Sequence, residues 1–262
     1  MIRNFRSIEN SYIENFAEME DRGDHIIFWD EKLPDMYAFN CILVKENINM
    51  ATIESFVADR LDQAISNRQD FLNIIIHPEL EITEILKERF IGMGFKIQTN
   101  LYMKLSDNKL GSIKGNKNCV VVRAGSEKEY EDGQRLDIKT SINADMPAEF
   151  AMEKSLRKKE VFQQKNSRLL SYLCYYQDIS IGKCELYMKD EYAKIEDFDV
   201  LDNYQRKGFG TAMLEKMISD ALESGKKYIY LITGKADTPR EMYEKTGFEI
   251  IGEEVELFCS KK

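Results

Sequence analysis

The segment DVLDNYQRKGFGTAML, residues 199–214, decides how this chain of 262 residues is interpreted. An alternating stretch typical of a strand leads into it, glycines stand at positions 208 and 210, and an amphipathic helix pattern follows. The first N–H groups of a helix lack partners and carry partial positive charge, so this turn is expected to bind an anion. The two glycines would let a diphosphate approach the main chain, and Arg206 and Lys207 would add positive charge.

Two common phosphate motifs do not describe this turn. The pattern G-x-x-x-x-G-K-[ST] is absent from the chain, and a dinucleotide fingerprint would need a glycine or alanine where Met213 stands. Arg206 and Lys207 could also be solvated turn charges, but the neighbouring glycines favour a phosphate ligand.

Two sequence elements resemble the Gcn5-related N-acetyltransferase (GNAT) family. Gln205-Arg-Lys-Gly208-Phe-Gly210 is similar to its Q/R-x-x-G-x-G/A signature, and Tyr243-Glu-Lys-Thr-Gly247-Phe248 is similar to its later Y-E-K-L-G-F element. The resemblance covers nearly all of residues 119–262. It implies an α/β (α+β) fold, with a mixed, mostly antiparallel sheet flanked by helices and a second, smaller α/β domain at the N-terminus.

The pattern along the chain predicts the elements of such a fold. Residues 126–165 are polar and favour helices, with a break at Pro147. Strands are predicted at 71–78, 119–124, 168–176, 179–188, 193–201 and 228–233, and helices at 81–91, 211–224 and 238–245.

The resemblance implies an acetyl-CoA site. In this family the main chain of the strand before the turn pairs with pantetheine, amides of the turn hold the pyrophosphate, and a tyrosine gives a proton to the leaving thiolate. The tyrosine corresponds to Tyr243, although a tyrosine on a short amphipathic helix can also serve only in packing. The predicted acetyl-CoA-binding residues are Phe198, Asp199, Val200, Gln205, Arg206, Lys207, Gly208, Phe209, Gly210 and Thr211.

An amine must also lose a proton before it attacks a thioester, and residues 119–262 contain no histidine for that task. Strand alternation places Glu196 and Phe198 on one face and Asp197 and Asp199 on the other, until a bulge reverses them. Some family members carry a glutamate base where this chain has Lys194. We therefore predict Glu196 as the base, two residues further along the same face.

The N-terminal half ends in a similar way but lacks the anion turn. A lysine- and glycine-containing seam at 106–118 predicts a linker between domains 1–105 and 119–262. GFKI at 94–97 matches GFEI at 247–250, which indicates a repeated strand–helix–strand unit.

Phe90, which cannot donate a proton, falls where the second half has its tyrosine, and no glycine occurs between Asp24 and Ile91. The segment Val44–Arg68 instead is expected to run into an uninterrupted helix. We therefore expect residues 1–105 to form a degenerate, catalytically silent acetyltransferase-like domain. The alternative is an unrelated α/β domain used for dimerisation, and a homodimer is possible.

Composition limits the partners. Thirty-seven basic against 46 acidic side chains give a formal net charge of −9, which disfavours nucleic acid. No apolar run reaches membrane-spanning length and the start has no secretory signal, so we expect no membrane partner and a cytoplasmic location. Five scattered cysteines indicate free thiols, and two isolated histidines predict no metal site.

These observations favour an N-acyltransferase that moves an acetyl group from acetyl-CoA to a small-molecule or peptide amine, directly and within a ternary complex. The alternative is a non-catalytic acyl-CoA-binding sensor or scaffold protein. A third possibility is a structural module whose glycine turn binds nothing.

Overall fold

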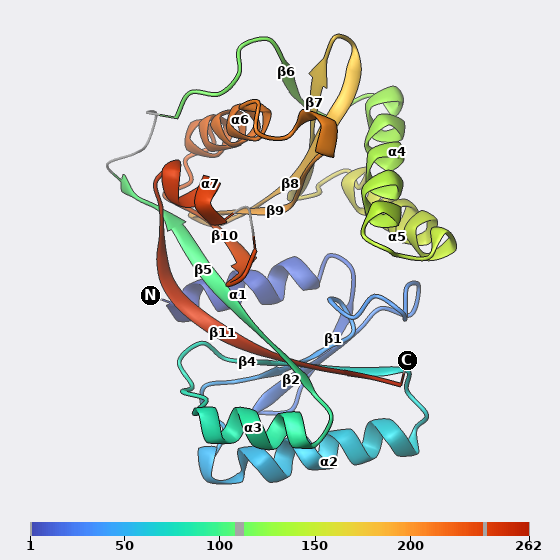
Figure 1. Ribbon diagram of the computed structural model, residues 1–262, viewed down its shortest axis with the longest axis vertical. Coiled ribbons are helices and arrows are strands. Elements are labelled where there is room, and N and C mark those ends of the chain that lie inside the picture. Colours follow the sequence, from blue (N-terminus) through green and yellow to red (C-terminus); the bar gives the residue numbers. More distant parts are fainter. Residues whose placement is uncertain (1, 108–112, 238–239, 262) are drawn as a thin grey trace. The chain divides into compact units, whose positions relative to one another are not determined.

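The computed structural model describes residues 2–107, 113–237 and 240–261 (Figure 1). It divides into two compact units. The first unit comprises Met1–Tyr102, Thr233–Asp237 and Ile251–Lys262, and the second comprises Met103–Ile232 and Thr238–Ile250. The middle of the predicted linker and the start of the helix predicted at 238–245 lie outside the described residues.

The first unit is a mixed sheet with helices. Its strands follow the order β1-β2-β3-β4-β11-β5, and β3 runs parallel to β4 while β11 runs antiparallel to it. The helices are α1 (Ile2–Ile13), α2 (Ile53–Ser66) and α3 (Glu84–Gly92). The strands are β1 (Glu18–Asp21), β2 (His25–Trp29), β3 (Ile42–Val44), β4 (Phe71–Ile76), β5 (Lys96–Leu105) and β11 (Phe248–Ser260). The residues of β5 from Met103 onward and the residues of β11 before Ile251 belong to the second unit.

The second unit has the strand order β10-β9-β8-β7-β6, antiparallel except for the parallel pair β9 and β10. The helices are α4 (Glu127–Asn143), α5 (Ala148–Phe162), α6 (Phe209–Glu223) and α7 (Arg240–Lys245). The strands are β6 (Val120–Arg123), β7 (Leu169–Tyr176), β8 (Ile179–Lys189), β9 (Tyr192–Val200) and β10 (Tyr228–Gly234).

Alternation along β8 shows which helices cover which face of this sheet. Cys184 points to α6, where its Sγ lies 3.0 Å from Sδ of Met217. Its neighbour Glu185 points the other way, to Lys158 of α5. Figure 1 shows α4 and α5 on one side of β7 and β8 and α6 on the other. The sheet therefore has an α6 face and an α4/α5 face.

The two units repeat one arrangement of elements. In each, a strand is followed by a short 3-10 turn, a helix and a second strand parallel to the first: β3, α2 and β4 in one unit, β9, α6 and β10 in the other. A shorter helix and a long strand then follow. This agrees with the repeat predicted from GFKI and GFEI.

Most predicted elements are confirmed, including the strands β7, β8 and β9 and the helix α6. The segment Val44–Arg68 leads into an uninterrupted helix, α2, which begins only at Ile53, after β3 ends at Val44 and a 3-10 turn forms at Met50–Thr52. In this turn the side chain of Asn49 accepts a hydrogen bond from the amide of Ala51, which competes with helical pairing.

The units also differ from the predicted domain boundaries, because the chain end returns to the first unit. Residues 255–260 of β11 pair with residues 71–76 of β4. In the parts of the chain that the structure describes, no helix is both long and apolar enough to cross a membrane.

Candidate active site

The glycine turn joins β9 to α6 in the second unit. After Val200 the chain forms a 3-10 turn at Asp202–Tyr204, and Gln205 Nε2 donates to the Val200 carbonyl over 3.0 Å. Gly208 precedes the first residue of α6 with φ of +79°, a left-handed conformation that glycine adopts without strain. Gln205 thus fixes the entry to the turn and Gly208 redirects the chain into the helix.

Gly210 allows close packing at the start of α6. A Cβ atom at this position would lie 3.1 Å from Sδ of Met242 and 3.4 Å from Cε1 of Phe198. Any larger side chain here would project into the space between the helix and these two residues. A side chain at this position would therefore press on Met242 and Phe198, which would have to shift by a few tenths of an ångström.

A cavity of about 370 Å³ opens at this terminus. Arg206 and Lys245 supply its positive charges, and Asp199 is the one carboxylate among the residues that line it. The lining residues are Phe198, Asp199, Val200, Gln205, Arg206, Gly208, Gly210, Thr211, Met242, Lys245 and Thr246. Eight of the ten predicted acetyl-CoA-binding residues are thus brought together around one cavity.

The remaining two, Lys207 and Phe209, do not line it. Lys207 Nζ donates to the carbonyl of Asn203 over 2.7 Å. Phe209 is buried and its ring packs 5.1 Å from that of Tyr176. Both side chains therefore stabilise the turn without lining the cavity. The main-chain groups of Lys207 and Phe209 still belong to the glycine turn.

The end of the predicted linker braces the turn. The amide of Asn116 donates to the Gly208 carbonyl over 3.0 Å, and Asn116 Nδ2 donates to the Lys207 carbonyl over 2.8 Å. The amide of Gly115 donates to Glu215 Oε2 of α6 over 2.8 Å. The polar, glycine-containing sequence of residues 106–118 predicted a linker and did not predict its contact with the glycine turn.

Tyr243 lies beside the cavity but not on its wall. Its side chain on α7 is 6% exposed, and its ring packs against Phe198 and Phe248 with centroid distances of 6.3 and 6.0 Å. Its neighbour Met242 lines the cavity, as does Phe198. Tyr243 therefore contacts the wall of the cavity through Phe198 without lining it.

The side chain of the predicted base, Glu196, forms an ion pair. Its Oε2 lies 2.8 Å from Nζ of Lys194, whose side chain is buried. A bulge at Asp197, with φ of +48°, shifts the register of β9 against β8. Glu196 is paired with Glu185, which points to α5, so it shares the α4/α5 face with Asp197. Phe198 points to the opposite face, so the bulge breaks the predicted alternation.

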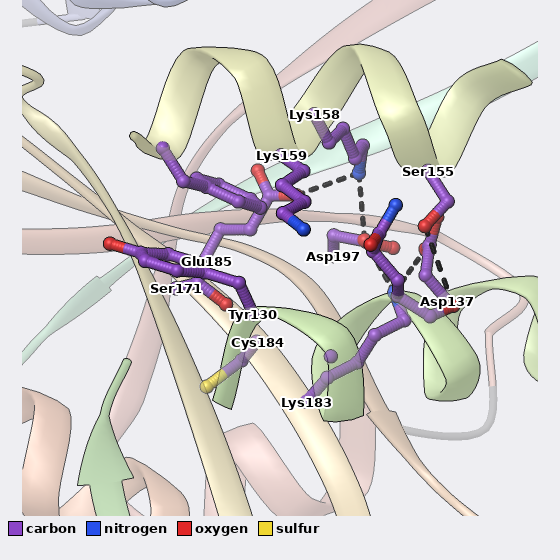
Figure 2. A pocket seen from close by; sticks show the side chains of 13 residues that line it. Tyr130, Asp137, Ser155, Lys158, Lys159, Ser171, Lys183, Cys184, Glu185 and Asp197 are labelled. Atoms are coloured by element: carbon purple, nitrogen blue, oxygen red, sulfur yellow. Dashed lines mark hydrogen bonds and ion pairs between the residues drawn. The ribbon is translucent and has the colours of Figure 1, made fainter. Parts of the chain in front are cut away.

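A buried ionic cluster, missed by the sequence analysis, holds this bulge (Figure 2). Lys158 Nζ of α5 lies 2.7 Å from both Glu185 Oε1 and Asp197 Oδ2. Lys183 Nζ contacts Asp197 Oδ2 and lies 2.9 Å from Asp137 Oδ1. The cluster comprises Asp137, Lys154, Lys158, Lys183, Glu185 and Asp197, each at least partly buried.

Burial and neighbouring charges shift the pKa values of these groups in opposite directions. Burial lowers the pKa of Lys158, but the carboxylates of Asp197 and Glu185 outweigh it and the pKa lies above its usual value. Burial raises the pKa of Asp197, but Lys158 and Lys183 hold it well below the ordinary range. Glu185 keeps a raised pKa because burial dominates there. Asp197 is therefore a fixed charge and a poor proton acceptor.

The cavity within the cluster, about 30 Å³, is large enough for about one water molecule and too small for a substrate. Lys183 Nζ also lies 3.2 Å from Asp199 Oδ2, which links the cluster to the larger cavity. A signal was present in the sequence: Lys183 and Glu185 flank Cys184 within an otherwise apolar strand. Charges at such positions need buried partners.

Comparisons with known proteins agree with this geometry. Residues 136–248 match the family model described as the acetyltransferase (GNAT) family. The chain is 26% identical over 255 residues to a Bacillus subtilis (strain 168) protein named "Uncharacterized N-acetyltransferase CgeE", and the match covers 95% of each.

Three solved structures share the fold at low sequence identity. A functionally unknown conserved protein from Staphylococcus epidermidis has a TM-score of 0.75 at 17% identity, covering 96% of each chain. A GCN5-related N-acetyltransferase from Kribbella flavida has a TM-score of 0.70 at 12% identity, covering 98% of this chain and 94% of its own. A tandem GNAT protein from the clavulanic acid biosynthesis pathway has 0.56 at 12%, covering 84% and 73%. The fold thus extends over nearly the whole chain.

Proposed function

We propose that this chain, whose residues 136–248 match the acetyltransferase (GNAT) family model, transfers an acetyl group from acetyl-CoA to an amine. The observation that carries the proposal is the cavity of about 370 Å³ at the glycine turn. The amides that begin α6 and the side chain of Arg206 suit a diphosphate, and Gly210 leaves room for it. The main chain of Phe198–Val200 would hold pantetheine.

The transfer step needs one proton acceptor and one proton donor. Bound acetyl-CoA supplies the thioester carbonyl that the amine attacks. We propose that Asp199, rather than Glu196, accepts the ammonium proton, because Asp199 is the one of the two that lines the cavity. Its ion pair with Lys183, at 3.2 Å, leaves 42% of the Asp199 side chain exposed. A new C–N bond then forms, the nitrogen loses its second proton to solvent, the C–S bond breaks, and Tyr243 gives its proton to the thiolate. The proton on Asp199 returns to Tyr243 through solvent after the products leave.

The second candidate is a non-catalytic acyl-CoA sensor. Neither Tyr243 nor Glu196, the two residues first predicted to be catalytic, is among the residues that line the cavity, and Glu196 is engaged by a lysine. A sensor would bind CoA and release no thiol from acetyl-CoA with any amine.

An assay of thiol release from acetyl-CoA with a panel of amines separates the two candidates. The panel would contain amino acids, peptide N-termini, polyamines and aminoglycosides. We expect turnover with at least one class, and expect Asp199→Asn to lower kcat by roughly 100-fold or more while Glu196→Gln changes it little. No turnover across the panel, together with tight CoA binding, would favour the sensor. Equal losses in both variants would contradict the choice of Asp199.

A matched pair of glycine variants tests the role of the turn. Gly208 and Gly225 both have positive φ, +79° and +75°, and stand at opposite ends of α6. Alanine at either position costs about 1–2 kcal/mol of folding stability through the same backbone strain. Only Gly208→Ala is expected to weaken CoA binding, by roughly tenfold, as measured by calorimetry at a temperature where both variants are folded. Equal CoA affinity in the two variants would show that the turn does not hold the ligand.

The five cysteines are free thiols, which supports a reducing location such as the cytoplasm. The acceptor amine, from a small molecule or a peptide, would enter on the side of Asp199.

The degenerate N-terminal domain proposed from the sequence has Phe90, fully buried, at the position of Tyr243 and no glycine turn before α2.

A further inference from the structure

The first unit contains a cavity of about 460 Å³, larger than the one at the glycine turn. Its walls come from β2, from the start of β3 and β4, and from the C-terminal half of α2. Phe28, Cys41 and Leu72 form a buried apolar part of the wall, while Gln63 and Asn67 contribute amides. The wall therefore combines an apolar surface with hydrogen-bonding groups, as small-molecule sites do.

This cavity lies away from the place where an acetyltransferase turn would be. The repeated arrangement of elements would put such a turn after the carboxyl end of β3, between Val44 and the start of α2. The cavity instead contacts Ile42 and Phe71, at the amino ends of the parallel strands β3 and β4. It is therefore not a remnant of the CoA site.

Charges of both signs line this cavity without ion-pair partners. Arg60 of α2 and Arg68 of the following loop are its cations, and Asp35 and Asp70 are its carboxylates. Across residues 2–107, 113–237 and 240–261, no ion pair within 4.0 Å joins any of these four to another side chain. Elsewhere in the unit, by contrast, Arg3, Arg6 and Arg22 are each paired.

Two polar atoms in the wall are buried and unsatisfied. Arg60 Nε and Asn73 Oδ1 have no hydrogen-bond partner in the described part of the chain, and Asn73 is 1% exposed. Burying a donor or an acceptor without a partner costs about 1–3 kcal/mol each, so such groups need an explanation. One atom is a donor and the other an acceptor, and both side chains line the same cavity.

We propose that this cavity binds a small zwitterion with the chemistry of a free amino acid or a dipeptide. The carboxylate of the ligand pairs with the guanidinium of Arg60, and its ammonium group donates to Asn73 Oδ1 and pairs with Asp35 or Asp70. Its side chain packs on Phe28 and Leu72. Arg60 already lies over the Phe56 ring, 5.4 Å from its centroid, and Asn73 Nδ2 donates to the Tyr37 carbonyl, so what these side chains lack is a partner for Arg60 Nε and for Asn73 Oδ1. A simple anion would leave Asn73 Oδ1 and both carboxylates without an ionic or hydrogen-bonding partner, and a simple amine would leave Arg60 Nε and Arg68 without one. The site is independent of acyl transfer in the second unit.

Trp29, the single tryptophan of the chain, lines this cavity and reports on its occupancy. The full-length protein would be titrated with a panel of free amino acids and dipeptides while tryptophan fluorescence and thermal unfolding are recorded. The best ligand would then be compared with its two truncated analogues, the carboxylic acid without the amine and the amine without the carboxylate. We expect saturable fluorescence changes and a raised Tm with the zwitterion, and binding weaker by roughly tenfold or more with each analogue.

Arg60→Met is expected to weaken binding of the zwitterion by roughly tenfold or more. Arg22→Met removes an exposed arginine outside the cavity and serves as the matched control, with affinity unchanged. CoA affinity, measured in parallel, shows whether each variant is folded, and Arg60→Lys should retain part of the binding. The proposal is overturned if no panel member changes fluorescence or Tm, if the acid binds as well as the zwitterion, or if folded Arg60→Met binds like the unchanged protein.

Discussion

Replacing Tyr243 by phenylalanine is expected to lower kcat by roughly two to four orders of magnitude while leaving the affinity for CoA unchanged. The hydroxyl is the group that we propose gives a proton to the leaving thiolate. The ring itself packs against Phe198 and Phe248, and phenylalanine preserves those contacts. Turnover, its pH profile and CoA binding should be measured on the same preparations.

The control for this substitution is Tyr176→Phe. Tyr176 packs behind the turn on Phe209 and does not line the cavity, so its loss of a hydroxyl should leave kcat unchanged. If Tyr243→Phe lowers kcat and CoA affinity by the same factor, Tyr243 acts by positioning Phe198. If it changes neither, the thiolate leaves without its help and the donor assignment is wrong.

The second large effect concerns the buried ionic cluster. Lys158→Met should destabilise the protein by about 3–5 kcal/mol, because it leaves Glu185 and Asp197 buried beside fewer cations. The adjacent substitution Lys159→Met removes a lysine whose partner, Glu127, is 61% exposed, and it should cost about 1 kcal/mol or less. Chemical denaturation of the two variants measures both values.

Adding Glu185→Gln to Lys158→Met tests the cause of that loss. Neutralising Glu185, which loses its lysine partner in Lys158→Met, should recover part of the stability, since the destabilisation comes from an uncompensated buried charge. A similar cost for Lys158→Met and Lys159→Met, or no recovery in the double variant, would mean that the cluster contributes little to folding.

The glycine turn and helix α6 could be predicted because their signals are local. Gly208, Gly210 and the apolar stripe of the helix lie within one short segment, and the backbone conformation follows from those residues. The meander β7–β8–β9 is predictable for the same reason. The strand pattern allowed for a bulge in β9 but could not place it at Asp197. Its position depends on contacts with Lys158 and Lys183, which lie on other elements.

The placement of the chain end could not be predicted, because it depends on pairing between distant residues. Residues 255–260 complete the first unit by pairing with β4, although they follow the second unit in the sequence. A fragment of residues 1–105 would lack this strand and leave an edge of β4 unpaired. CoA binding by the N-terminal domain must therefore be tested in the full chain. A Gly208→Ala variant of the full chain weakens the competing site, so that CoA binding elsewhere can be detected.

The most direct test of the account compares two ligands that differ in the diphosphate. Calorimetric titration of the full-length protein with CoA and with pantetheine asks whether the turn at Gly208 holds that group. We expect CoA to bind, and pantetheine to bind more weakly by roughly 100-fold or more, since several charge-assisted hydrogen bonds are lost. Equal affinity for the two ligands, or no binding of CoA, would contradict the proposed site.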